Sequence, residues 1–403
     1  MERWLKKGHR AVAYLDHSEE PDMTRVLMLG RRRILSHPGG DTVQMRKTAQ
    51  ALRPLGFEAE ITDSLAPDFK RIDLVHCFSM MDPVEPILLR AAQAREAGLP
   101  VALSTVYWPW PGLKMQYYRR PASFLAAALL HHAGQAFNRS ALYPAAGLAW
   151  ALLRRRPWPH AVIRFRHGVM RWLHSQDSMR QRLLSMCQVI LPNSYAELGV
   201  LKGKFENLPP HVIVPNAVDD LFVHAKPDWF ERQFGRRDFV LCVGAINFRK
   251  NQLGLIRALG AGGKDLVLIG QGCGRYAELC RREAPRALFI PRLEGEQLAS
   301  AYAAARVHAL PSWYDTPGLA SLEAFVSGCP VVVTEFGSTR EYFGPLAAYC
   351  SPTDHASIRA ALEKASAKRP SFALRREFQA RFSWQEAAKA TAAAYSMPFV
   401  HNY

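Results

Sequence analysis

The feature that most constrains the fold is a regular alternation of short apolar runs with segments of helical periodicity. In the second half of the chain, the apolar runs 239–245, 265–270 and 330–334 alternate with helical patterns such as 251–260 and 318–328. Apolar runs of this length are typical of strands buried on both faces, and such strands form parallel sheets covered by helices. The same alternation in the first part of the chain predicts another sheet of this kind.

The length of the chain sets the expected number of domains. The chain has 403 residues, which is long for one domain, so two domains of about 200 residues are expected. The α/β pattern predicts Rossmann-like, doubly wound parallel-sheet domains over 1–222 and 223–385. A C-terminal helix or tail over 386–403 is expected to pack back on the first domain. A basic helical insertion over about 111–185 interrupts the first domain.

This insertion contains most of the excess positive charge of the chain, whose formal net charge is +17. Between residues 111 and 185 strand patterns disappear, and twelve Lys or Arg accompany a single acid, Asp177. Basic residues interleaved with Trp and Tyr, on segments too short to cross a bilayer, are typical of helices lying in a membrane interface. We therefore expect an anionic membrane surface as a partner. The alternative is a helical subdomain with a solvated basic face; a nucleic-acid partner is not expected, because no nucleic-acid-binding motif is present.

Cysteine usage and the N-terminal sequence indicate a cytoplasmic protein. The seven cysteines are odd in number, and no two have the two-residue spacing typical of zinc sites. The N-terminal residues lack the sustained apolar core of a secretory signal, and no apolar stretch reaches the ~18 residues of a membrane span. Together with the basic insertion, this predicts a peripheral protein on the inner face of the cytoplasmic membrane.

Two segments of the second half suit a phosphate group. Segment 243–259 ends a strand at Gly244 and carries Arg249 and Lys250 just before a helix, where basic side chains and the helix dipole both favour an anion. A solvated basic turn is the alternative. The glycine cluster 269–279 also lies between a strand and a helix, but it lacks the full G-x-G-x-x-G spacing, and a tight turn explains its glycines equally well.

Segment 312–325 places the carboxylates Asp315 and Glu323 on either side of Pro317-Gly318, where a helix is expected to begin. Glycine at a helix start lets a ligand approach the backbone N–H groups closely. Carboxylates accept hydrogen bonds from vicinal hydroxyls, whereas the helix start and a nearby lysine suit a diphosphate. The segment therefore fits a nucleotide sugar. The alternative is a loop aspartate followed by a capped amphipathic helix.

The sequence resembles the retaining glycosyltransferases of family 4, also called group 1, which have the GT-B fold of two facing Rossmann-like domains. The resemblance covers nearly the whole chain. It rests on the segments GGDTVQ (39–44), LPNSYAE (191–197), VIVPNAVD (212–219), VGAINFRKNQ (243–252) and LPSWYDTPGLASLEAFVSGCPVVVTEFGSTRE (310–341). The last of these is the most specific, because it contains the family's pair of acids eight positions apart and the glycine-Glu turn after it.

The resemblance implies a role for each matching residue. Glu323 would bind the ribose hydroxyls of the donor, Asp315 would contact and orient the transferred sugar, and Lys250 would hold the diphosphate; these three form the expected catalytic set. The donor-binding set implied in addition consists of Gly39, Gly40, Arg249, Gly270, Gly272, Arg292, Pro317, Gly318, Leu319 and Ala320.

Two departures from the family pattern concern the donor. Asp315 replaces the usual Glu and is one methylene shorter. Ala245 stands where relatives usually have an Arg beside the phosphates, so Arg249 is a candidate substitute.

A third departure concerns the acceptor. The strand end STVYWP (104–109) lacks the histidine that many relatives place there. Tyr107 and Trp108 are therefore acceptor-side candidates, with aromatic packing as an equal alternative. His76 is a further candidate, although a hydrogen-bonded position in the core or the crevice is the favoured interpretation.

The resemblance implies transfer of a sugar from a UDP- or GDP-linked donor with retention at the anomeric carbon. No Asp-x-Asp motif is present, so neither a metal nor a cofactor is expected. The basic insertion favours a lipid-linked acceptor, such as a lipopolysaccharide core, a polyprenyl diphosphate oligosaccharide or a glycolipid, and the composition is compatible with a bacterial source. Two alternatives stay open: a sugar-nucleotide epimerase of GT-B fold, and a non-catalytic nucleotide-sugar-binding scaffold, which Ala245 and Asp315 favour.

Overall fold

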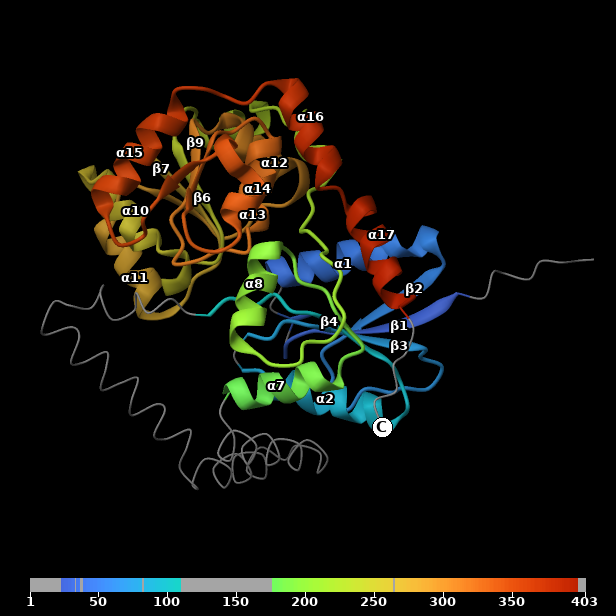
Figure 1. The fold of residues 1–403 in the computed structure, drawn as a ribbon. Coiled ribbons are helices and arrows are strands. Elements are labelled where there is room, and N and C mark those ends of the chain that lie inside the picture. Colours follow the sequence, from blue (N-terminus) through green and yellow to red (C-terminus); the bar gives the residue numbers. More distant parts are fainter. Residues whose placement is uncertain are drawn as a thin grey trace, which may run out of the picture.

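The computed structural model describes residues 23–397, apart from residues 33, 37–38, 82, 110–175 and 264 (Figure 1). Most of the predicted basic insertion lies outside these residues, and only its end is described, as part of helix α7 (Gln176–Met186). The predicted tail beyond residue 397 also lies outside them. Within the described ranges, no helix is long and apolar enough to cross a membrane.

The first domain is built on a five-stranded parallel sheet with the strand order β2-β1-β3-β4-β5. The strands are β1 (Thr24–Leu29), β2 (Phe57–Thr62), β3 (Leu74–Phe78), β4 (Val101–Ser104) and β5 (Val189–Ile190). The accompanying helices are α1 (Gly40–Leu52), α2 (Glu85–Glu96), α7 and α8 (Tyr195–Lys204), with a 3-10 turn η1 (Arg53–Leu55). The order of the strands changes direction between β1 and β3, which makes the sheet doubly wound.

The second domain is built on a six-stranded parallel sheet with the order β11-β10-β9-β6-β7-β8. The strands are β6 (Val240–Val243), β7 (Leu266–Ile269), β8 (Leu288–Ile290), β9 (Val307–Leu310), β10 (Val331–Thr334) and β11 (Ala348–Cys350). The helices are α9 (Asp228–Phe234), α10 (Gln252–Leu259), α11 (Gly274–Glu283), α12 (Gly295–Ala304), α13 (Leu319–Val326), α14 (Thr339–Phe343), α15 (His355–Ser366) and α16 (Phe372–Arg381). The 3-10 turns are η2 (Asp220–His224), η3 (Phe248–Lys250), η4 (Ala261–Gly263) and η5 (Gly344–Leu346). Here the order changes direction between β6 and β9, and ligands of such sheets bind outside the carboxyl ends of the strands at that point.

The central strands are buried on both faces, as their apolar runs predict, whereas the edge strands β2 and β8 are partly exposed. In β6, Val240 and Cys242 pack into one hydrophobic core, whereas Leu241 and Val243 pack into another. Because successive side chains of a strand point to opposite faces, these are the cores on the two sides of the sheet. The predicted fold class, with doubly wound parallel sheets covered by helices, is confirmed.

The chain crosses between the two domains twice. The crossings run side by side, since the N–H of Val218 donates a hydrogen bond to the carbonyl of Phe382 (2.8 Å). After the second crossing, α17 (Trp384–Tyr395) lies along α1 of the first domain (Figure 1). The hydroxyl of Tyr395 in α17 is 2.6 Å from Nδ1 of His76, in the core of that domain. The exact boundaries assigned to the domains from the sequence stay predictions.

Helix α14 of the second domain contacts the first domain through two adjacent side chains. The carboxylate of Glu341 accepts hydrogen bonds from the N–H groups of Tyr195 (2.9 Å) and Ala196 (2.8 Å), the first residues of α8. The hydroxyl of Tyr342 donates to the carbonyl of Asn193 (2.6 Å). The first N–H groups of a helix have no intrahelical acceptor and carry the positive end of its dipole, so Glu341 caps a helix of the other domain.

Replacing Glu341 with Gln removes the charge of this cap and places an amide NH2 beside helix N–H groups. We expect a loss of about 1 kcal/mol of stability, which corresponds to a fall in Tm of about 2–4 °C for a domain of this size. Differential scanning calorimetry measures it. The control is Glu363→Gln on α15, whose carboxylate is exposed. An unchanged Tm in Glu341→Gln, or an equal fall in the control, would contradict the capping role.

Candidate active site

The candidate site lies at the carboxyl ends of the second sheet, where two loops are in close contact. The loop after β6 begins at Gly244, and the loop after β7 begins at Gly270. A Cβ atom on Gly270 would lie 2.0 Å from the carbonyl oxygen of Gly244, and one on Gly272 would lie 2.6 Å from Cβ of Ile246. Gly270 and Gly272 are therefore required by the packing of these two loops, whereas nothing lies within 4 Å of a Cβ atom on Gly274, whose φ is 73°.

Lys250 is positioned by the short turn η3 and by the residue after it. The side chain of Asn247 caps this turn by accepting the N–H of Lys250 (3.2 Å). Asn251 adopts a left-handed conformation (φ 53°), and its side-chain amide donates to the carbonyls of Pro311 and Pro352, both at 3.0 Å. These bonds fix the loop after β6 against the loops after β9 and β11.

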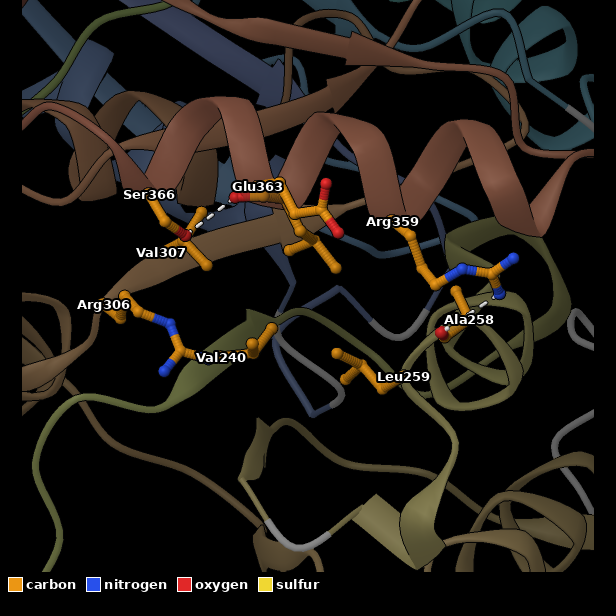
Figure 2. Close-up of a pocket in the computed structure, with 9 residues that line it drawn as sticks. Val240, Ala258, Leu259, Arg306, Val307, Arg359, Glu363 and Ser366 are labelled. Atoms are coloured by element: carbon orange, nitrogen blue, oxygen red, sulfur yellow. Dashed lines mark hydrogen bonds between the residues drawn. The ribbon is translucent and has the colours of Figure 1, made fainter.

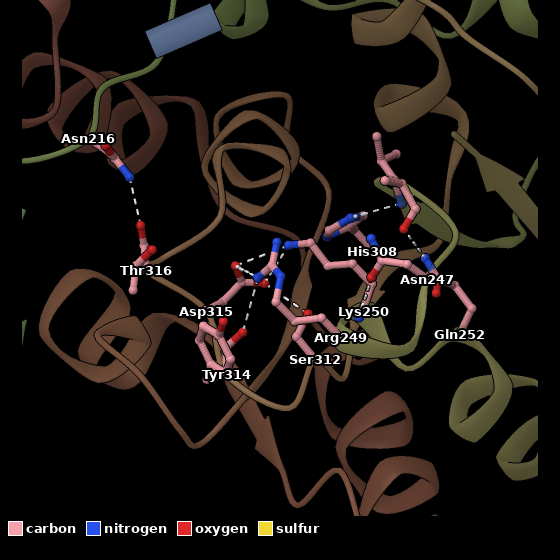
Figure 3. A network of polar contacts seen from close by, with 12 residues as sticks. Asn216, Asn247, Arg249, Lys250, Gln252, His308, Ser312, Tyr314, Asp315 and Thr316 are labelled. Atoms are coloured by element: carbon pink, nitrogen blue, oxygen red, sulfur yellow. Dashed lines mark hydrogen bonds and ion pairs between the residues drawn. The ribbon is translucent and has the colours of Figure 1, made fainter. Parts of the chain in front are cut away.

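Lys250 and Asp315 form a buried ion pair (Figure 3). The Nζ atom of Lys250 is 2.8 Å from Oδ2 and 3.0 Å from Oδ1 of Asp315. The hydroxyl of Ser312 donates to Oδ2 (2.9 Å), and Nη1 of Arg249 lies 3.4 Å from Oδ1. Three sequence-predicted site residues, Arg249, Lys250 and Asp315, are thus brought together.

The electrostatics of this group follow from its burial and its charges. Burial alone would raise the pKa of Asp315, but Lys250 and Arg249 offset this effect, so the pKa of that carboxyl lies below its ordinary value. Burial and the neighbouring Arg249 lower the pKa of the Lys250 ammonium. His308 lies beside the pair and is buried, and burial lowers its pKa to about 3, so its ring is neutral.

Helix α13 begins directly above the ion pair. Its N-cap, Gly318, has φ 90°, and a Cβ atom there would lie 3.1 Å from Cγ of Asp315. The first N–H groups of this helix, at Leu319 and Ala320, have no acceptor inside the helix, which makes this end attractive to an anion. Pro317, the remaining member of the predicted helix start, is buried beside them.

The first domain reaches this helix start with its own glycine loop. A Cβ atom on Gly40 would lie 3.8 Å from the Leu319 side chain. Gly39 is the N-cap of α1, so the N-terminal ends of α1 and α13 lie close together. The predicted glycines 39 and 40 and the start of α13 therefore face each other across the interface of the domains.

Glu323 lies in the second turn of α13 and is partly exposed. Its Oε2 accepts a hydrogen bond from the hydroxyl of Tyr302 on α12 (3.0 Å). Burial raises the pKa of Glu323 to about 7, the Tyr302 hydrogen bond opposes this shift, and the negative Asp219 adds to it. Asp219 in turn pairs with Nζ of Lys47 on α1 (2.9 Å).

Other predicted residues lie further from the ion pair. Arg292 follows β8 and is exposed, where it pairs with Glu294. His76 is buried in the first sheet, and both ring nitrogens are hydrogen-bonded, Nδ1 to Tyr395 and Nε2 to Ser104 (2.9 Å). Burial lowers the pKa of His76 to about 3. The structure thus favours the interpretation of this histidine as part of the core.

The two aromatic candidates differ in their surroundings. Tyr107 is buried, and its ring packs edge-on against Phe205 with Arg180 and Lys204 nearby. Trp108 is only partly buried. Aromatic packing therefore accounts for Tyr107, whereas Trp108 keeps its acceptor-side role as a prediction.

Several polar contacts of the site were not predicted from the sequence, and three of them involve residues outside the predicted set. These are Ser312 with Asp315, Tyr302 with Glu323, and the Asn216 amide with the carbonyl of Thr316 (2.7 Å). A hydroxyl three residues before an acid in one loop is a local signal that would have found the first. The other two join distant segments, and no local pattern relates them.

A separate surface pocket of about 370 Å³ lies on the second domain (Figure 2). Val240 and Val307, the first residues of β6 and β9, line it together with Arg306 and Arg359. It therefore lies at the amino ends of the strands, on the edge opposite the candidate site. Among the described residues, no group of three or more His, Cys, Asp or Glu side chains is placed to hold a metal ion.

Comparisons with known proteins match both the sequence and the fold. Residues 237–367 match the family model described as Glycosyl transferases group 1. The glycogen synthase of Mycobacterium tuberculosis is 30% identical over 172 residues, which are 39% of this chain and 42% of that protein. The match thus spans less than half of that relative's length.

Solved structures resemble nearly the whole chain at low identity. Sucrose-phosphate synthase from Thermosynechococcus elongatus has a TM-score of 0.63 and 17% identity, covering 92% of this chain and 98% of its own. Anabaena HepE in complex with UDP-glucose has a TM-score of 0.60 and 13% identity, covering 93% and 100%. At these identities the likeness shows the fold.

The raised pKa of Glu323 predicts a pH dependence of stability. The folded state keeps the proton of Glu323 up to about pH 7, whereas the unfolded state releases it near pH 4.5, so stability falls as pH rises between these values. Glu323→Gln imitates the protonated form at every pH. We therefore expect the free energy of unfolding of the variant to exceed that of the wild type by an amount that grows between pH 4.5 and pH 7. The difference should reach about 1–3 kcal/mol and stay constant above pH 7.

Urea unfolding of both proteins at several pH values measures this difference. The buried His76 and His308, whose pKa values are lowered to about 3, change stability in the opposite direction, but they are common to both proteins and cancel. A difference that does not vary with pH would contradict the raised pKa of Glu323.

Proposed function

We propose that this chain of GT-B fold, whose residues 237–367 match the group 1 glycosyltransferases, moves a sugar from a UDP- or GDP-linked donor to an acceptor. The observation that carries this proposal is the placement of Lys250 and Arg249 beneath the start of α13. Two cations and the N-terminal end of a helix, set at the strand ends of a doubly wound sheet, suit a diphosphate.

The donor is held by groups from both domains. The amides at Gly318, Leu319 and Ala320 and the side chain of Lys250 bind the diphosphate, while Gly39 and Gly40 approach it from the first domain. Glu323, a partly exposed residue one turn further along the helix, accepts hydrogen bonds from the ribose hydroxyls. The complex of HepE with UDP-glucose supports a nucleotide sugar as the ligand of this fold.

The same groups act in the reaction. As the bond from the sugar to the diphosphate breaks, negative charge develops on the leaving oxygen, and fixed N–H donors with Lys250 stabilise it without reorganisation. Removing one such donor typically costs about 3–4 kcal/mol of barrier stabilisation. We propose retention at the anomeric carbon, with the leaving phosphate oxygen accepting the proton of the acceptor hydroxyl, and a reaction that needs no metal.

We propose a lipid-linked acceptor at the inner face of the cytoplasmic membrane of a bacterial cell. The support is the sequence of residues 111–185, where arginines are interleaved with aromatic residues. Such a segment would bring the first domain to anionic headgroups, with about 1 kcal/mol for each well-placed basic residue. Domain closure would then exclude water from the donor.

Thermal shift with UDP, GDP, UDP-glucose and GDP-mannose tests donor binding, because a ligand that binds only the folded state raises Tm. We expect at least one of the two nucleotides to raise the Tm of the wild type, and Lys250→Met to lose that shift relative to its own unliganded Tm. Lys364→Met on α15, an exposed lysine, is the control and keeps the shift. No shift in the wild type with any of the four ligands would contradict the proposal.

Turnover separates the proposed activity from its alternatives. A transferase releases the nucleoside diphosphate from the donor in the presence of membrane lipid extract; an epimerase converts the donor without extract and without release, and a scaffold does neither.

The membrane role of the basic segment has its own test. Replacing Arg154, Arg155 and Arg156 with Glu reverses the charge of its densest cluster. We expect the variant to lose binding to vesicles that contain anionic lipid, by about tenfold or more, in a vesicle sedimentation assay. Vesicles of neutral lipid alone serve as the control. Unchanged binding to anionic vesicles would count against the interfacial role.

A further inference from the structure

We propose that Asp315 is a positioning residue for Lys250 and Arg249 and that it does not bind the donor sugar. This inference rests on the proposed function, because it concerns the diphosphate site of that function. It differs from the role that the resemblance implies for the first acid of the pair.

The hydrogen-bonding capacity of the Asp315 carboxylate is already used. Two carboxylate oxygens offer about four acceptor positions. Oδ1 receives Lys250 (3.0 Å) and Arg249 (3.4 Å), and Oδ2 receives Lys250 (2.8 Å) and Ser312 (2.9 Å). A sugar hydroxyl could therefore bind only by displacing one of these donors, three of the four contacts being from cations.

Asp315 is also enclosed by its surroundings, and its backbone is held in place. Asp315 is 4% exposed, and its backbone is fixed on both sides, because its N–H donates to Phe336 (3.2 Å) and its carbonyl accepts from Ser338 (3.0 Å). Gly337 packs so closely that a Cβ atom there would lie 1.9 Å from the Asp315 carbonyl oxygen. With one methylene fewer than Glu, the side chain ends beneath Gly318.

The charges make this arrangement useful for a diphosphate. Two cations beside one carboxylate leave one net positive charge in the group, and the neighbouring His308 is neutral. Asp315 thus holds both basic side chains at one place under the start of α13 and limits their mutual repulsion. Both cations are kept at the position where the phosphates of the donor would lie.

The decisive experiment compares a ligand that has the sugar with one that lacks it. Dissociation constants of the Asp315→Asn variant and the wild type are measured by calorimetry for UDP and UDP-glucose, or for GDP and GDP-mannose. A positioning residue affects both ligands of a pair, so we expect both constants to rise by the same factor, about 10- to 100-fold. Weakened binding of the nucleotide sugar with unchanged or tighter binding of the nucleoside diphosphate would overturn the proposal.

A double-variant cycle tests whether Asp315 acts through Lys250. In a Lys250→Met background, Asp315→Asn should raise the dissociation constant of the diphosphate by a clearly smaller factor than in the wild type, because only Arg249 is then left to be positioned. The uncharged Met–Asn pair also keeps the double variant foldable. Asp315→Glu, which restores the charge, should recover most of the affinity lost in Asp315→Asn. Asp265→Asn, an exposed acid before β7, is the control. If the two substitutions change the dissociation constant independently, so that their factors multiply in the double variant, the proposal is overturned. A wild type that binds neither ligand would instead refute the proposed function.

Discussion

The buried ion pair between Lys250 and Asp315 is the interaction on which the candidate site depends. It joins the loop after β6 to the loop after β9, and the stacked rings of Phe248 and Trp313 (5.5 Å) join the same two loops beside it. A buried charge without a partner costs several kcal/mol, so each of the two residues requires the other. The pair therefore fixes the strand-end loops of the second sheet before any ligand binds, and the start of α13 lies on this fixed base.

Charge is divided between the two ends of the proposed donor pocket. Lys250, Arg249 and the starts of α1 and α13 make one end positive, which suits phosphate groups. Glu323 and Asp219 make the other end acidic, and Lys47 of α1 balances it from the first domain. An elongated ligand with phosphates at one end and hydroxyls at the other matches this division, and both ends take groups from both domains. This is the physical reason that the site is complete only when the domains face each other.

Much of the fold could be predicted from the sequence, and less of the site. Strand and helix periodicities are local, so the doubly wound sheets were predicted correctly, and residues 237–367 match the group 1 glycosyltransferase model that the resemblance implied. The motif predicted that Lys250 and Asp315 belong to one site. It did not predict their direct contact, because the two residues are 65 positions apart and their pairing depends on the register of β6 against β9. The bond from Tyr395 to His76 spans 319 positions and required knowledge of where α17 packs. Such contacts are set by tertiary structure, and no periodicity contains them.

The paired crossings at Val218 and Phe382 have a mechanical consequence. Two chain segments that are joined by a hydrogen bond at one point resist sliding and stretching there, but they permit rotation about that point. A rotation of the domains about this point would separate Glu341 and Tyr342 from their partners in the first domain. Separation of the domains would release the cap of α8, and their return would restore it. The same hydrogen bonds would thus define the relative position of the domains each time they close.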